Sequence, residues 1–181
     1  MPAKYDLPQI SSLTGRKIFF DANVLIYLFW PTGSQHWENR YSNAYGNLLT
    51  QGNELVVDHL VISETINVAI RAEYRKHLLA NTLTEQVLPF KTFRNSAEGQ
   101  SVVNDVYLIV KHSILDLFTI VEKNFTKADI ESFLTYDTLD FNDKGILAIC
   151  KENDFVLLTN DKDFNTTEID ILTANSILLQ S

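Results

Sequence analysis

Two aspartates directly follow apolar runs that are typical of buried strands. Asp21 comes after residues 17–20, and Asp161 lies two residues beyond the run at 154–159. If both runs belong to one parallel sheet, their carboxyl ends meet at the same edge, where the sites of α/β proteins lie. Carboxylates a few ångströms apart repel each other and raise each other's pKa. The two positions therefore predict an acidic site at one edge of a sheet.

Two further acids lie near the starts of expected helices. Glu64 is one turn into a helix expected over residues 60–77, and Asp143 begins a helix expected over residues 143–152, with Asn142 as its cap. Mg²⁺ prefers oxygen ligands and would keep such carboxylates ionised together. A bound metal activates water and orients a phosphodiester, and it reverses the local charge that would repel a nucleic acid. If the fold brings the four acids together, they predict a site for a hard divalent cation.

Each acid also has an ordinary structural role open to it. Asp21 and Asp143 could be a helix cap and a first-turn acid, and Asp161 could be a turn residue. Glu64 could be a solvated helix residue. The third acidic position has a second candidate, because Asp140 lies one helical turn before Asp143. We prefer Asp143 because it opens the apolar helix.

Short apolar strands and helices alternate along the chain, and its 181 residues favour a single domain over 1–181. Strands are expected at 17–20, 54–58, 154–159 and 169–172, and helices at 23–29, 37–51, 60–77 and 143–152. Apolar strands separated by helices favour an α/β fold with a mostly parallel central sheet, covered on both faces. Residues 1–15 are expected to form a loosely attached N-terminal arm. Residues 84–136 are expected to be a helical insertion, with Thr126 capping one of its helices.

Composition limits the classes of function and location. The net charge of −8 argues against a nonspecific nucleic-acid binder, which normally shows a basic field. Cys150 is the one cysteine, so no intrachain disulfide can form and a reducing, cytoplasmic location is expected. The N-terminus lacks the apolar core of a signal peptide, and no run approaches the ~20 apolar residues of a membrane span. The four histidines show no metal-ligand spacing.

Three segments together resemble the motifs of the PIN-domain family. Residues 19–26 (Phe-Phe-Asp-Ala-Asn-Val-Leu-Ile) resemble its opening motif, and residues 142–149 resemble the helix of its third acid. Residues 157–164 (Leu-Leu-Thr-Asn-Asp-Lys-Asp-Phe) resemble the turn of its fourth acid, and Ser63-Glu64 fits the second. The order of the four acids, each in its expected element, is the most specific part of the resemblance.

The resemblance implies a PIN-like three-layer α/β/α fold and a Mg²⁺- or Mn²⁺-dependent endoribonuclease, a hydrolase acting on RNA. The residues that would hold the metal or position water are Asp21, Glu64, Asp143 and Asp161, with Asp163 as an outer ligand. Asn23 and Thr159 would support the pocket by hydrogen bonds. Many bacterial members of this size are VapC-type toxins held inactive by an antitoxin, and they are often homodimers. The resemblance therefore extends to an antitoxin partner and a homodimer, which no residue here indicates by itself.

A basic helix end lies beyond Glu64. Arg71, Arg75 and Lys76 are expected to be a solvated face, and contact with RNA phosphates is a second hypothesis because they share a helix with Glu64. The separation of Glu64 and Asp143 is longer than in compact toxin-type members, and the extra length falls in residues 84–136. Such an insertion would reshape the RNA groove, the dimer face or the antitoxin face.

Two other functions fit parts of the pattern. A haloacid-type phosphatase needs a second aspartate two residues after the first, where this chain has Asn23. A receiver domain needs adjacent acids at the first strand, where Asp21 stands alone. A non-catalytic PIN-like module that binds protein or RNA would be expected to lack one or more acids. Since all four are present, RNA hydrolysis is the main hypothesis and the binding module is the alternative.

Overall fold

The fold is built on short parallel strands. The computed structural model describes residues 2–30, 33–166 and 168–180. Within them the strands are β1 (Lys4–Asp6), β2 (Lys17–Phe20), β3 (Glu54–Val57), β4 (Thr119–Ile120), β5 (Val156–Leu158) and β6 (Ile171–Thr173). They form one sheet in the order β1-β6-β5-β2-β3-β4, and every pairing is parallel. The predicted α/β fold with a parallel central sheet is confirmed.

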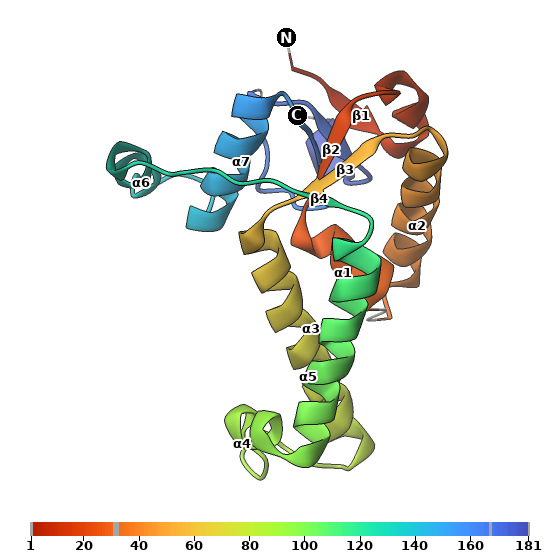
Figure 1. The fold of residues 1–181 in the computed structure, drawn as a ribbon, viewed down its shortest axis with the longest axis vertical. Coiled ribbons are helices and arrows are strands. Elements are labelled where there is room, and N and C mark those ends of the chain that lie inside the picture. The colour runs from red at the N-terminus through yellow and green to blue at the C-terminus, as the bar shows by residue number, and fades with distance from the viewer. Residues whose placement is uncertain (1, 31–32, 167, 181) are drawn as a thin grey trace.

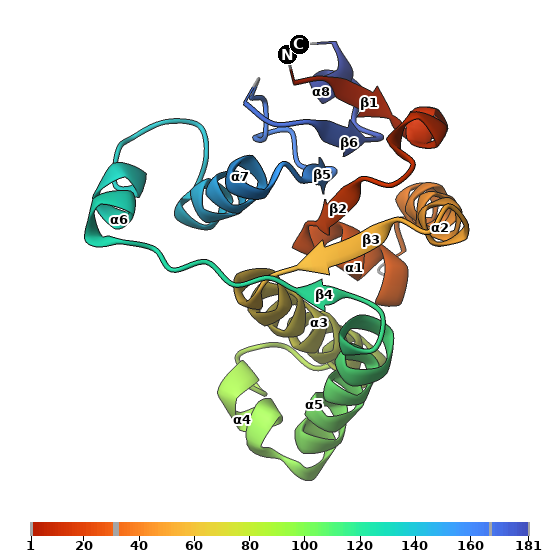
Figure 2. The ribbon, with the colours of Figure 1, turned by 45° about the horizontal axis from the view of Figure 1, so that its top comes forward.

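Helices connect the strands and cover the sheet (Figure 1). They are the 3₁₀ helix η1 (Leu7–Leu13), α1 (Ala22–Phe29), α2 (Gln35–Thr50), α3 (His59–Ala80), α4 (Phe90–Asn95), α5 (Ala97–Ile109), the π-helical turn η2 (Val110–Leu115), α6 (Lys127–Phe133), α7 (Phe141–Asn153) and α8 (Ser176–Leu179). Figure 2 shows α7 on one side of the strands and α2 on the other. This arrangement agrees with the predicted three layers.

The central strands are apolar because helices bury both of their faces. Phe19, Phe20, Val57 and Leu157 are all 0% exposed. Burying a large apolar side chain contributes roughly 1.5–3 kcal/mol, so β2, β3 and β5 form the firmest part of the molecule. The backbone positions of residues that directly follow these strands are therefore well fixed.

Helices α3 and α5 run side by side away from the sheet and end at α4 (Figure 1). A small second core forms at this end from Tyr74, Leu78 and Phe93. Gly99 allows α4 and α5 to meet closely, because a Cβ there would lie 1.9 Å from the carbonyl oxygen of Phe93. The close approach at Gly99 sets the corner between α4 and α5.

The N-terminal segment is not a loose arm. Residues 4–6 form β1, which pairs in parallel with β6, and η1 buries Leu7, Ile10 and Leu13. The expectation was wrong for these residues because β1 is a three-residue edge strand, Lys-Tyr-Asp, without an apolar alternation. Residue 1 lies outside the described part of the chain.

The segment expected as a helical insertion is helical only in parts. Helices α4, α5 and η2 extend to residue 115, but β4 follows as an edge strand beside β3. An extended stretch then leads to α6, which Thr126 caps as predicted by accepting the backbone N–H of Asp129. Helix α6 stands beyond α7 (Figure 2) and buries none of its own residues.

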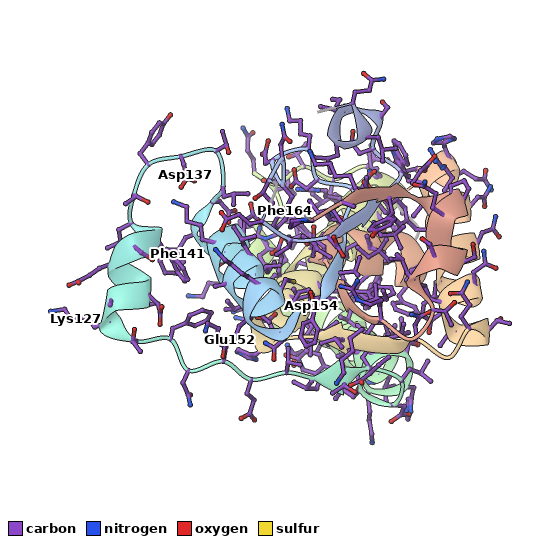
Figure 3. All side chains as sticks on the ribbon, turned by 90° about the horizontal axis from the view of Figure 1, so that it is seen from above. Lys127, Asp137, Phe141, Glu152, Asp154 and Phe164 are labelled. Carbon is purple, nitrogen blue, oxygen red and sulfur yellow. The ribbon has the colours of Figure 1, made fainter. Side chains whose placement is uncertain are left out.

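A lysine attaches this outlying segment to the body of the protein. The Nζ atom of Lys144, on α7, donates to the carbonyls of Phe133 and Thr135 and pairs with Asp137 at 3.1 Å. Phe141 lies between α6 and α7 (Figure 3), and its ring centroid is 5.8 Å from that of Phe133. Polar and aromatic contacts together hold α6 beside α7.

Candidate active site

Asp21 sits at the carboxyl end of the central strand β2. Its backbone N–H donates to the carbonyl of Leu158 in β5 at 3.1 Å, which ties it to the neighbouring strand. Asp21 occupies the N-cap position of α1, yet its side chain makes no capping hydrogen bond. Its Oδ2 atom instead accepts from Asn23 Nδ2 and Thr159 Oγ1, both at 2.6 Å. Capping therefore does not explain this buried aspartate, which is 6% exposed.

Thr159 links Asp21 to the turn that carries Asp161. The Thr159 hydroxyl donates to Asp21 and accepts the backbone N–H of Asp161 at 2.9 Å. The Oδ1 atom of Asp161 accepts the backbone N–H of Asp163 at 2.9 Å, so Asp161 also stabilises its own turn. The Asp163 side chain is exposed and makes no hydrogen bond or ion pair within the described residues. Asp161 is therefore linked to Asp21 through the Thr159 hydroxyl, whereas the Asp163 side chain has no such link within the described residues.

Tyr41 also supports this turn, a role that no local sequence pattern indicates. Its hydroxyl lies 3.1 Å from the carbonyl oxygen of Thr159 and 3.0 Å from Asn160 Oδ1, and it accepts the N–H of Ala174 at 3.0 Å. Burial raises the pKa of Tyr41 to about 12, so the hydroxyl remains a donor. Asn160 in turn donates its backbone N–H to Asn23 Oδ1 at 3.2 Å. From sequence alone, a tyrosine in an amphipathic helix is expected to pack in the hydrophobic core. The hydrogen-bond partners of Tyr41 become visible only in the folded structure.

The two helical acids are placed by the caps of their helices. Asp58 follows β3 and accepts the backbone N–H of Val61 at 2.8 Å, so it caps the start of α3 shortly before Glu64. Asp140 is the N-cap of α7 and accepts the backbone N–H of Asp143 at 2.9 Å. The predicted cap at residue 142 was wrong, because α7 already begins at residue 141 and its capping box joins Asp140 to Asp143.

The fold brings the four predicted acids within electrostatic range of one another. Burial, followed by the charges of Glu64 and Asp161, raises the pKa of Asp21 to about 6, although the hydrogen bond from Thr159 lowers it. Burial, together with the charges of Asp140 and then Asp21, raises the pKa of Asp143 to about 7. The pKa of Glu64 is raised by burial and by the charges of Asp140 and Asp161. Asp140 therefore belongs to this acidic cluster as a fifth member.

The chemistry of these donors fits a hard divalent cation. All are carboxylate oxygens, which Mg²⁺ prefers, and a cation relieves the repulsion that raises their pKa values. Among the described residues, however, no three Asp, Glu, His or Cys side chains converge closely enough to hold a metal ion. Binding would require the carboxylates to draw together.

A cleft begins at Glu64 and follows α3. Its volume is about 290 Å³, and Glu64, Asn67 and Arg71 are part of its wall. The Arg71 guanidinium carbon lies 4.5 Å from the ring centroid of Phe90. Lys76, by contrast, pairs with Glu73 at 2.7 Å and lines a different hollow beside α1. Of the three predicted RNA contacts Arg71, Arg75 and Lys76, the structure places Arg71 in the same cleft as Glu64.

Comparison with known families agrees with this geometry. The chain matches the PIN domain over residues 18–169, a range that contains all four predicted acids. The chain belongs to the PIN domain family. PIN domains are generally nucleases that act on RNA or DNA and generally use divalent metals. Neither the curated proteins nor the solved structures gave a match. In the described part of this PIN domain, no helix is long and apolar enough to cross a membrane.

Proposed function

We propose that this PIN domain is a divalent-metal-dependent endoribonuclease that hydrolyses phosphodiester bonds in RNA. The observation that carries the proposal is Asp21, a buried carboxylate at the end of β2 whose pKa is raised by burial and by two neighbouring acids. Burying a charge beside like charges costs stability, and such arrangements cluster at functional sites. Because PIN domains are generally nucleases, hydrolysis of a phosphodiester is the reaction that we expect these acids to support.

In this proposal, carboxylates hold a Mg²⁺ or Mn²⁺ ion: Asp21, Glu64, Asp143 and Asp161, with Asp163 as an outer ligand. The bound metal would supply an activated water and polarise the phosphodiester. Asn23 and Thr159 orient Asp21 by holding its Oδ2 atom, as their hydrogen bonds indicate. Tyr41 positions the turn of Asp161 through the Thr159 carbonyl.

The proposal includes a biological setting. The enzyme would be the toxin of a toxin–antitoxin pair in the cytoplasm, bound as a homodimer to an antitoxin. Family membership alone supports this part of the proposal. Expression of the protein should then arrest growth, and Asp21→Asn should abolish the arrest. Growth at the normal rate during wild-type expression would contradict the toxin role and leave the nuclease proposal intact.

One observation favours a second candidate, a non-catalytic PIN-like module that binds protein or RNA. The acidic side chains of the described residues do not converge into a closed metal-ligand set. A binding module would need no metal, so divalent cations should leave its melting temperature unchanged.

Cleavage assays separate the two candidates. Purified protein is incubated with a mixed RNA pool or matched DNA, in Mg²⁺, Mn²⁺ or EDTA, beside Asp21→Asn and Asp161→Asn. Metal-dependent cutting of RNA that both variants lose supports the nuclease. The binding module becomes the better account if RNA stays intact and metal stabilises neither the wild type nor the variants.

A further inference from the structure

A second cleft continues the first one along α3. The first, which we call the proximal cleft, is lined by Glu64, Asn67 and Arg71 among others. The second, the distal cleft, has a volume of about 340 Å³ and is lined by Asn67, Phe90, Arg94 and Tyr107 among others. Asn67 is common to both walls. The two clefts therefore form one track that leads from Glu64, at the edge of the acidic cluster, to α4 and α5.

Arg71 is fixed at the junction of the two clefts. It lines the proximal cleft, and its guanidinium lies over the ring of Phe90, which lines the distal cleft. A guanidinium held over an aromatic face keeps its donors free for phosphate. A phosphate that leaves the acids along this track meets Arg71 first and Arg94 next.

Within the described residues, cations without acidic partners gather on α3 and α4, two of the helices that line this track. Arg71 and Arg75 on α3 and Lys91 and Arg94 on α4 make no ion pair within residues 2–30, 33–166 and 168–180. Many cations elsewhere are neutralised, as Lys144 is by Asp137. In a chain of net charge −8, these helices offer the positive surface that a polyanion needs.

The distal cleft also has a surface for the flat face of a base. Tyr107 is 54% exposed on α5, and the Phe90 ring, beneath Arg71, lies in the same wall. Sequence-tolerant binding of single strands combines a positive groove with aromatic side chains on which bases stack. A duplex hides its base faces and presents phosphates, so an aromatic hollow favours an unpaired strand.

We infer that the track formed by the proximal and distal clefts binds single-stranded RNA on one side of the scissile phosphate. Arg71 and Arg94 contact phosphates, and Tyr107 stacks on a base. This inference rests on the proposed ribonuclease function for the identity of the strand. It adds that an RNA long enough to reach α4 and α5 binds more tightly than one that covers the acids alone.

The inference is tested by fluorescence anisotropy in the Asp21→Asn background with Mg²⁺. The probes are labelled single-stranded RNAs of about 4, 8 and 12 nucleotides, spanning the usual site sizes of such grooves. A single-stranded DNA and a duplex RNA of the same sequence are the comparison ligands. Affinity should rise with the length of the single strand, and the duplex should bind more weakly.

Three groove variants are compared with a matched control. Arg71→Gln combined with Arg94→Gln should lower the slope of log affinity against log salt by about 1.4, since each single-strand phosphate contact contributes about 0.7. Tyr107→Ala should weaken binding by about five- to a hundredfold, whereas Tyr107→Phe keeps the ring and should bind normally. Lys111→Gln removes a cation of η2 that has no ion pair within the described residues and lies outside both clefts, so it should change affinity and salt slope little.

The outcomes separate this inference from the proposed function. If wild-type protein cuts RNA but the groove variants bind RNA like Lys111→Gln, the track is wrong and the nuclease stands. If nothing is cut but binding depends on Arg71, Arg94 and Tyr107, the track stands and the nuclease is wrong. Equal affinity for duplex and single strand would contradict the assignment to unpaired RNA. Melting temperatures equal to that of the parent show that the variants are folded.

Discussion

Replacing Asp21 by asparagine should stabilise the metal-free protein while it abolishes activity. At pH 8 the Asp21 carboxylate is ionised in both states, but burial and neighbouring acids disfavour its charge in the folded state and raise its pKa from 3.8 to about 6. That difference corresponds to ~3 kcal/mol of stability lost. Asparagine removes the charge and keeps an acceptor oxygen for Thr159 and Asn23, although neutral hydrogen bonds are weaker by ~1 kcal/mol.

The expected net gain is ~2 kcal/mol in the free energy of unfolding, which raises the melting temperature by ~4–8 °C for a chain of this size. Thermal denaturation of wild type and Asp21→Asn in EDTA measures it. The matched control is Asp105→Asn, an exposed aspartate on α5, which should melt like the wild type. Adding Mg²⁺ should stabilise the wild type more than Asp21→Asn, because the variant binds the metal less tightly.

The effect of Asp21 on the free energy of unfolding should change with pH in one direction. As pH falls below about 6, folded Asp21 takes up its proton before the unfolded chain does, so the destabilising contribution of Asp21 to the wild type is lost toward pH 4. The advantage of Asp21→Asn should therefore shrink between pH 8 and pH 4. If Asp21→Asn melts below the wild type in EDTA at pH 8, the buried charge is not a cost and the reasoning fails.

Three further predictions concern the framework of the site. Tyr41→Phe should lower the free energy of unfolding by ~1–3 kcal/mol, because the buried N–H of Ala174 loses its acceptor; an unchanged urea midpoint would show that this hydroxyl is dispensable. Lys144→Met should speed amide exchange in α6 but not in α7, because it releases Phe133, Thr135 and Asp137; equal exchange in both proteins would argue against that attachment. Gly99→Ala should destabilise the protein by ~1–3 kcal/mol, because its Cβ would meet the Phe93 carbonyl. Gly46→Ala is its counterpart within α2, with open space around it, and should stabilise by up to ~1 kcal/mol; melting shifts of the same sign in both would contradict the packing argument.

The sequence predicted the central strands and missed the edges of the sheet. Strands β2, β3 and β5 are continuous apolar runs because both faces are buried, and such runs stand out in a sequence. Edge strands β1 and β4 have three and two residues, and both residues of β4 are exposed. Neither carries a periodic signal, so only their partners β6 and β3 define them.

The places of the four acids in the fold could be predicted, because each lies just after a strand or within the first turns of a recognisable helix. The details around them depend on contacts far apart in sequence. Asp140 rather than residue 142 caps α7, and this moved the helix start by two residues. The partners of Tyr41 lie on β5's turn and after β6, more than a hundred residues away. No local pattern encodes such partners.

The most direct test of the central claim is to locate the metal. Crystals of the protein grown with Mn²⁺, at a concentration that supports RNA cleavage, are measured at a wavelength where manganese scatters anomalously. The account predicts an anomalous peak among the carboxylates of Asp21, Glu64, Asp143 and Asp161, and its absence in crystals of Asp21→Asn. A peak elsewhere, or no peak under conditions in which RNA is cut, would contradict it.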